Sequence, residues 1–139
     1  REKLTYVTRW IDAHVADAEA LGKPLVVEEF GKAVPVSGRR LDGLLPGESV
    51  AGDPRNGDFW VRDEFFRAVH DAVETSVSAG GAARGSAFWV VHQSDEAGGS
   101  DADPYQVGFD DWSTWQEVRA HATNVRDAEW RTFEGVCAA

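Results

Sequence analysis

Two adjacent carboxylates, Glu28 and Glu29, end a short apolar run in this chain. The preceding residues Leu25, Val26 and Val27 are branched and apolar, as in a parallel strand that is buried on both faces. A carboxylate at the carboxyl end of such a strand lies where α/β barrels place their catalytic groups. The pair therefore indicates catalytic chemistry at a strand end, and a solvated strand end is the alternative.

Strand geometry predicts different directions for the two carboxylates. Side chains alternate between the two faces of a strand, so Glu29 is expected to share a face with Leu25 and Val27. Glu28 is expected on the opposite face, together with Phe30. We therefore expect only one of the two glutamates to point into a site.

Hydrophobic spacing places helices around this strand. Apolar residues at helical intervals predict a helix over residues 2–21, which Gly22 ends. A strand over residues 25–29 follows. A second apolar face predicts a helix that Gly80-Gly81 stops, and its members are Phe65, Phe66, Val69, Val73 and Val77.

The rest of the chain continues the alternation of elements. Residues 85–92 predict a second buried strand. Two overlapping capping boxes, Ser113 with Gln116 and Thr114 with Glu117, predict a last helix that runs to about Arg131. This order predicts an α/β fold with a parallel sheet covered by helices. Two strands cannot close a barrel, and the chain lacks methionine, so we expect it to be the end of a larger domain.

Composition narrows the class of protein. The 139 residues are 42% hydrophobic, which is typical of one globular domain or part of one. The net charge of -10 repels phosphate backbones and anionic lipid surfaces, which argues against nucleic-acid and membrane partners. Cys137 is the single cysteine, so an intrachain disulfide is excluded.

Neither loop composition nor histidine spacing indicates a metal or cofactor site. Residues 33–58 form a long inserted loop that is either functional or disordered. The acidic residues between 94 and 103 do not have the spacing of a calcium-binding EF-hand. His14, His70 and His121 lack metal-ligand spacing and are interpreted as surface or packing residues.

Several short motifs follow one another in a recognisable order. They are Trp10-Ile11 with His14, Lys23-Pro24, Glu29-Phe30-Gly31-Lys32, Arg62-Asp63-Glu64-Phe65-Phe66, Gly80-Gly81, Gly85, Phe88-Trp89, Asp103, Tyr105-Gln106-Val107 and Ser113-Thr114. This set resembles the C-terminal part of the endo-β-1,4-mannanases of glycoside hydrolase family 5, in particular the plant-type group. The resemblance does not cover residues 33–58 or the tail after Arg126.

The resemblance implies a (β/α)8 barrel, to which residues 1–139 contribute strands seven and eight with their flanking helices. It implies that Glu29 is the catalytic nucleophile of a retaining hydrolase and that Trp89 stacks on a sugar ring. His92 is a further candidate for contact with substrate hydroxyls. Val90 stands where the family often has glutamine, which removes a polar contact but not the stacking surface.

The resemblance also bears on substrate and location. It implies a secreted enzyme that cleaves internal linkages of a mannan-type polysaccharide without a cofactor. The family's general acid lies on strand four, outside this chain, so the chain alone is expected to be inactive. A related β-glucanase and a non-catalytic carbohydrate-binding protein are the alternatives, and a buried core position is the alternative for Trp89.

Overall fold

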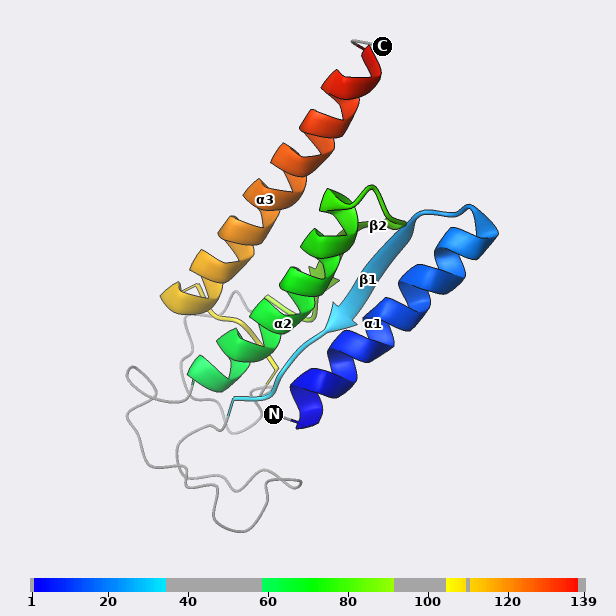
Figure 1. Cartoon of the computed structure of the whole chain (residues 1–139). Coiled ribbons are helices and arrows are strands. Elements are labelled where there is room, and N and C mark those ends of the chain that lie inside the picture. The colour runs from blue at the N-terminus through cyan, green and yellow to red at the C-terminus, as the bar shows by residue number, and fades with distance from the viewer. Residues whose placement is uncertain (1, 35–58, 92–104, 110, 138–139) are drawn as a thin grey trace.

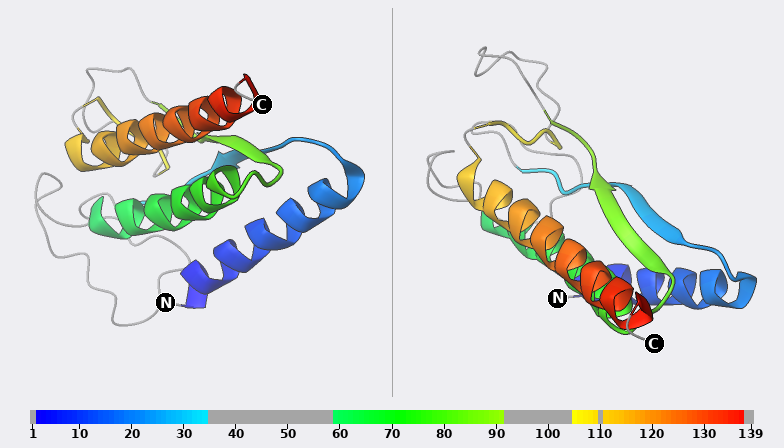
Figure 2. Two further views of the ribbon diagram at one scale, coloured as in Figure 1. Left: turned by 45° about the horizontal axis from the view of Figure 1, so that its top comes forward. Right: turned by 90° about the horizontal axis from the view of Figure 1, so that it is seen from above.

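Helices and strands alternate along the chain in the computed structural model, which describes residues 2–34, 59–91, 105–109 and 111–137. The elements are α1 (Glu2–Leu21), β1 (Leu25–Phe30), α2 (Phe59–Ser78), β2 (Ala83–Phe88) and α3 (Trp112–Cys137). β1 and β2 pair in parallel. The three helices lie together on one side of this sheet, with α2 between α1 and α3 (Figures 1 and 2). The predicted α/β class with a parallel sheet is confirmed for the described part of the chain.

Glycines end the first two helices with the same backbone motif. Gly22 has φ +63°, and the N–H groups of Gly22 and Lys23 donate to the carbonyls of Glu19 and Ala18. Gly80 has φ +73° and ends α2 with the equivalent pair of hydrogen bonds. A left-handed residue in this position is readily supplied by glycine. The predicted ends of both helices are therefore confirmed.

The hydrophobic core lies between the sheet and the helices. The apolar face predicted for the second helix is buried or half-buried, whereas Leu21 at the end of α1 is exposed. The fully or nearly fully buried members of the core are Ile11, Val27, Phe30, Phe66, Val69, Ala72, Val73, Val77, Ala83, Val107 and Ala128. α2 supplies five of them, more than any other element, and it contacts the sheet and both other helices.

The predicted boundaries of two elements are wrong. β2 spans Ala83–Phe88 rather than residues 85–92, and Val91 instead forms an isolated bridge with Val107. α3 begins at Trp112 and runs to Cys137, beyond the predicted end at Arg131. Neither predicted capping box marks the helix start, because Ser113 and Thr114 both lie inside α3, and the Thr114 hydroxyl accepts from Arg62 and donates to Asp63.

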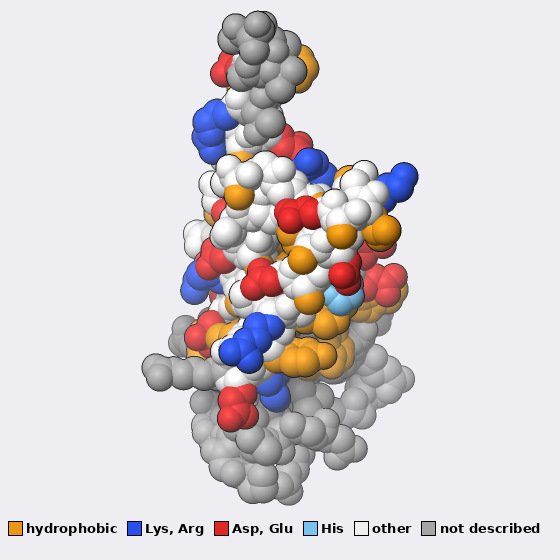
Figure 3. Space-filling model, turned by 45° about the vertical axis from the view of Figure 1, so that its right-hand side comes forward, with side chains coloured by type: hydrophobic (Ala, Val, Ile, Leu, Met, Phe, Trp, Pro, Cys, Tyr) orange, Lys and Arg blue, Asp and Glu red, His pale blue; other side chains and the backbone are white. Residues whose placement is uncertain are grey.

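The surface of the molecule mixes charged and apolar side chains. Figure 3 shows charged side chains of both signs spread over one face, with hydrophobic side chains gathered on part of it. No helix within the described ranges is long and apolar enough to cross a membrane.

Candidate active site

A β-bulge at Glu29 shapes the carboxyl end of β1. Glu28 pairs with Ala87 and Phe30 pairs with Phe88, so Glu29 is the extra residue between two consecutive pairs. Its φ is 55°, and it is the only described residue other than glycine with a positive φ. A left-handed conformation at such a residue costs about 1–3 kcal/mol, and strain of this kind concentrates at functional sites.

The bulge overturns the expected separation of the two glutamates by strand alternation. Val27 and Phe30 are both buried, and Phe30 packs against Phe66 of α2, so both side chains face the helices. Glu28 and Glu29 are both exposed. One inserted residue resets the alternation between Glu28 and Phe30. Strand parity therefore does not select one glutamate, and the choice of Glu29 depends on its place in the Glu-Phe-Gly-Lys motif.

Trp89 lies directly beside this strand end. Its backbone N–H donates to the Phe30 carbonyl at 2.8 Å, so it continues the parallel pairing of β1 with β2. The preceding side chain, Phe88, packs inward against Phe66 and Trp115. Trp89 itself is 49% exposed. The indole ring therefore does not belong to the core of the described structure. The peptide bond between Trp89 and Val90 is cis.

Gly31 allows the two strand ends to approach each other closely. A Cβ atom on residue 31 would lie 2.7 Å from the Trp89 carbonyl oxygen and 3.3 Å from Cδ1 of Tyr105. The first distance is shorter than real Cβ contacts, so a side chain at this position requires the backbone of Trp89 to move. Gly31 thus brings Trp89 and Tyr105 next to the residues that follow Glu29.

Residues 105–108 extend this end of the sheet. The Val107 N–H donates to the Val90 carbonyl at 2.8 Å, and Val107 is fully buried. Tyr105, which the motif comparison singled out, is exposed beside Gly31. The candidate His92, its neighbour Gln93 and the acidic residues 94–103 lie outside the described residues. The structure therefore brings Glu29, Trp89 and Tyr105 together at one edge.

A buried charged cluster supports the same edge from the helix side. Arg62 is 1% exposed, and its guanidinium donates to the Gln106 carbonyl at 2.9 Å, to Asp111 at 2.5 Å and to the Thr114 hydroxyl at 3.1 Å. Thr114 in turn donates to Asp63 at 2.6 Å. Sequence reasoning noted Arg62, Asp63 and Gln106 only as motif matches and Thr114 also as a helix cap, and it did not identify Asp111. The missed signal was an arginine four residues before Phe66, on the apolar face of the helix.

A second polar cluster lies between β2, α2 and α3. His121 Nε2 lies 3.0 Å from the Ser86 hydroxyl, and His121 Nδ1 lies 2.8 Å from a Glu74 carboxylate oxygen. His70 stacks on His121 with ring centroids 4.0 Å apart. Burial, together with repulsion by His121, lowers the pKa of His70 to about 3. The order serine, histidine, carboxylate is that of a nucleophilic triad, but both histidines are buried, so we interpret the cluster as packing.

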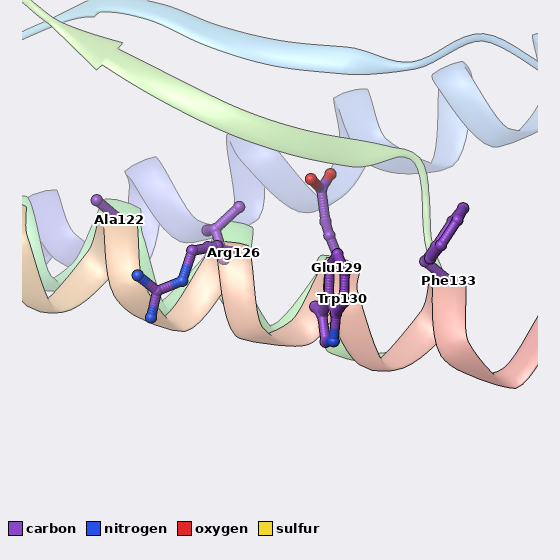
Figure 4. Close-up of a pocket in the computed structure, with 6 residues that line it drawn as sticks. Ala122, Arg126, Glu129, Trp130 and Phe133 are labelled. Carbon is purple, nitrogen blue, oxygen red and sulfur yellow. The ribbon is translucent and has the colours of Figure 1, made fainter.

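Two surface hollows lie away from the strand ends. One of about 490 Å³ is formed by the second half of α3 (Figure 4) and is lined by Ala122, Val125, Arg126, Glu129, Trp130 and Phe133. Another of about 450 Å³ is lined by residues of α1 and by Phe65. Neither hollow contains a pair of carboxylates. In the described ranges, no three His, Cys, Asp or Glu side chains gather to hold a metal ion.

Comparison with known proteins gives one consistent result. No protein-family model matches the chain. The chain is 34% identical to mannan endo-1,4-β-mannosidase 1 of Arabidopsis thaliana over 91 residues. These 91 residues cover 65% of this chain and 18% of that protein. It is 39% identical over 91 residues to mannan endo-1,4-β-mannosidase 2 of Oryza sativa subsp. japonica, covering 65% of the chain and 16% of that protein.

A longer match comes from the same plant. The putative mannan endo-1,4-β-mannosidase 9 of Oryza sativa subsp. japonica is 33% identical over 123 residues, which cover 86% of this chain and 25% of that protein. The chain thus spans a quarter or less of the length of these curated relatives. Over most of its length, this chain is similar in sequence to a part of the plant mannan endo-1,4-β-mannosidases.

Proposed function

We propose that this chain forms the nucleophile side of the active site of a retaining glycoside hydrolase that cleaves internal β-1,4-mannosidic linkages. The observation that carries the proposal is the position of Glu29. It is an exposed carboxylate on a strained bulge at a strand end, and Trp89 lies on the paired strand beside it. Similarity to mannan endo-1,4-β-mannosidases supports mannan as the substrate class.

In the proposed reaction, Glu29 acts as the nucleophile. A carboxylate oxygen attacks the anomeric carbon of the mannosyl unit while the bond to the leaving-group oxygen breaks. A general acid gives its proton to that oxygen. Water, deprotonated by the same group, then attacks the anomeric carbon of the covalent intermediate and releases Glu29 as a carboxylate. Two inversions at the same carbon retain its configuration.

Trp89 is the proposed stacking surface for a sugar ring. An indole face offers a flat apolar area with a donor at its edge, which suits a pyranose ring with apolar C–H groups on one face. The half-exposed position of Trp89 leaves the ring accessible. A backbone hydrogen bond to Phe30 holds the main chain of Trp89 beside the bulge, which supports this proposal.

We further propose that the general acid comes from a segment outside these 139 residues. Retention requires a second carboxyl group about 5–5.5 Å from the nucleophile. Glu28 is adjacent in sequence but pairs regularly with Ala87, and the matched relatives are at least four times as long as the matched segment. The remaining strands of a (β/α)8 barrel would supply that group. In keeping with the family resemblance, we propose that the full-length protein acts outside the cell.

The test is hydrolysis by the full-length protein that contains this chain. We expect it to release oligosaccharides from β-1,4-mannan, with early products in the β configuration by proton NMR. A parallel assay on a cellulose-type glucan separates the proposal from a β-glucanase. Binding to mannan without hydrolysis would indicate a carbohydrate-binding protein instead, and early products in the α configuration would contradict a retaining mechanism.

A further inference from the structure

Arg62 is buried, and two of its contacts lead to residues 105–108, the segment that supports Trp89. One guanidinium nitrogen donates to the Gln106 carbonyl at 2.9 Å, and another donates to Asp111 at 2.5 Å. The same Asp111 oxygen accepts the N–H of Gly108 at 2.9 Å. The arginine therefore holds residues 105–108 at both ends, by a direct bond and through a shared carboxylate.

The segment in turn holds the end of β2. Val107 donates its N–H to the Val90 carbonyl and bridges to Val91, the two residues that follow Trp89. Tyr105 lies against Gly31, two residues after Glu29. A displacement of residues 105–108 would thus reach the end of β2 through the Val107 backbone and the end of β1 through the Tyr105 side chain.

We propose that Arg62 is a positioning residue that fixes the Trp89 platform beside Glu29 by anchoring residues 105–108. The hydrogen bonds of Arg62 described above lead to the strand ends through Gln106, Val107 and Asp111, so we place its action on that route. The catalytic consequence rests on the proposed function of the strand ends. The structural consequence, that Arg62 orders residues 105–108, is independent of that proposed function.

The guanidinium group suits this task better than another cation would. It presents a rigid fork of N–H donors, and here the donors reach a carbonyl, a carboxylate and a hydroxyl on different elements. An ammonium group is a single point charge and cannot span the three acceptors. Two acidic side chains, Asp111 and Asp63, face the cluster and favour a fixed positive charge at its centre.

The experiment compares Arg62→Met with Arg67→Met in the full-length protein. Arg67 lies on the same helix and pairs with Glu117 of α3, so its replacement removes a contact between α2 and α3 without touching residues 105–108. Hydrogen–deuterium exchange and mannan kinetics are measured at a temperature at which circular dichroism shows each variant folded. We expect faster exchange at residues 105–109 in Arg62→Met only.

The kinetic readout separates positioning from loss of folded protein. Unfolding of a fraction of the enzyme lowers the apparent kcat but leaves KM unchanged. A misplaced Trp89 platform raises KM for mannan and lowers kcat/KM, by about 10- to 100-fold for a displacement near 1 Å. Arg67→Met is expected to keep both constants. Unchanged KM and unchanged exchange in Arg62→Met would overturn the proposal.

A milder variant tests the proposal if Arg62→Met does not fold. Asp111→Asn keeps the shape of the side chain and removes the charge that Arg62 contacts. It should raise exchange at residues 105–109 and raise KM in the same direction, and an unchanged variant would again overturn the proposal. If the full-length protein proves not to hydrolyse mannan, the proposed function fails, while the exchange comparison still decides whether Arg62 orders the segment.

Discussion

Gly31 and Trp89 meet through their backbones at the carboxyl ends of β1 and β2, where a Cβ on residue 31 would lie 2.7 Å from the Trp89 carbonyl oxygen. Because that oxygen belongs to the backbone, the clash cannot be relieved by a rotamer change. The contact joins the chain that leaves Glu29 to the residue that carries the proposed sugar platform. It explains in physical terms why glycine follows the glutamate and phenylalanine of the motif.

Gly31→Ala is therefore expected to destabilise the protein by about 1–3 kcal/mol, as overpacking in a fixed environment does. Gly85→Ala is the matched control, because a Cβ at Gly85 in β2 meets nothing within 4 Å. It should change the free energy of unfolding by less than about 0.5 kcal/mol or raise it slightly. Urea unfolding of both variants checks this, and equal losses would argue against the close approach.

Because of the bulge, glycine and alanine variants are expected to rank in opposite order of stability at Glu29 and at Glu28. At φ 55° alanine keeps the strain and glycine relieves it, so Glu29→Gly should be more stable than Glu29→Ala by about 1 kcal/mol. At Glu28, in the regular part of β1, glycine should be less stable than alanine by about 0.5–1 kcal/mol. The same ranking at both positions, measured by urea unfolding, would show that the bulge is absent.

The helices and strands could be predicted from the sequence because local signals determine them. Helical spacing and the glycines at 22 and 80 defined α1 and the end of α2, and apolar runs located both strands. The bulge at Glu29 was not predicted, because strand alternation assumes regular pairing. The positive φ of Glu29 depends instead on the register of β1 with β2. The capping boxes misplaced the start of α3, which is Trp112, and the bonds of Thr114 to buried partners on α2 are ones that no local pattern encodes.

The candidate site was predictable only in part for a related reason. Glu29 and Trp89 were both identified as candidates, and the parallel pairing places them on adjacent strands. The role of Arg62 depends on contacts with residues 44 and 49 positions further along the chain. Contacts of this length are set by tertiary packing, so neither motif spacing nor helical periodicity predicts them.

Trp89→Ala should weaken substrate binding more than folding. The side chain is half-exposed, so its loss should cost less than the about 3–5 kcal/mol typical of a buried aromatic residue. The affinity of the full-length protein for mannan oligosaccharides should fall about tenfold or more, equivalent to about 1.4 kcal/mol. Trp112→Ala, at the exposed start of α3, is the control and should change neither quantity. A large fall in melting temperature with unchanged affinity would assign Trp89 to the core.

The buried histidine predicts how stability depends on pH. His70 has a pKa of about 3 in the folded protein, whereas an unfolded histidine has a pKa near 6.5. Between these values only the unfolded chain binds the proton, so stability falls as the pH falls from about 6.5 toward 3, by up to about 1.4 kcal/mol per unit. Above pH 6.5 this contribution does not change.

His70→Phe retains an aromatic ring against His121 and removes the titrating group. The free energy of unfolding of this variant should decline less steeply than that of the parent between pH 6.5 and 3, and the two curves should run parallel above pH 7. Urea unfolding at a series of pH values provides the comparison. Parallel curves over the whole range would show that His70 does not carry the acid sensitivity.

The site of covalent labelling in the full-length protein tests most directly whether Glu29 is the nucleophile. A 2-fluoro mannoside with an activated leaving group slows the breakdown of the glycosyl-enzyme more than its formation, so the sugar stays on the nucleophile. Tandem mass spectrometry of the peptide that contains β1 should find the added mass on Glu29, and Glu29→Gln should abolish both labelling and hydrolysis. Glu28→Gln should still be labelled on Glu29. A sugar on Glu28, or full activity of Glu29→Gln, would contradict the account.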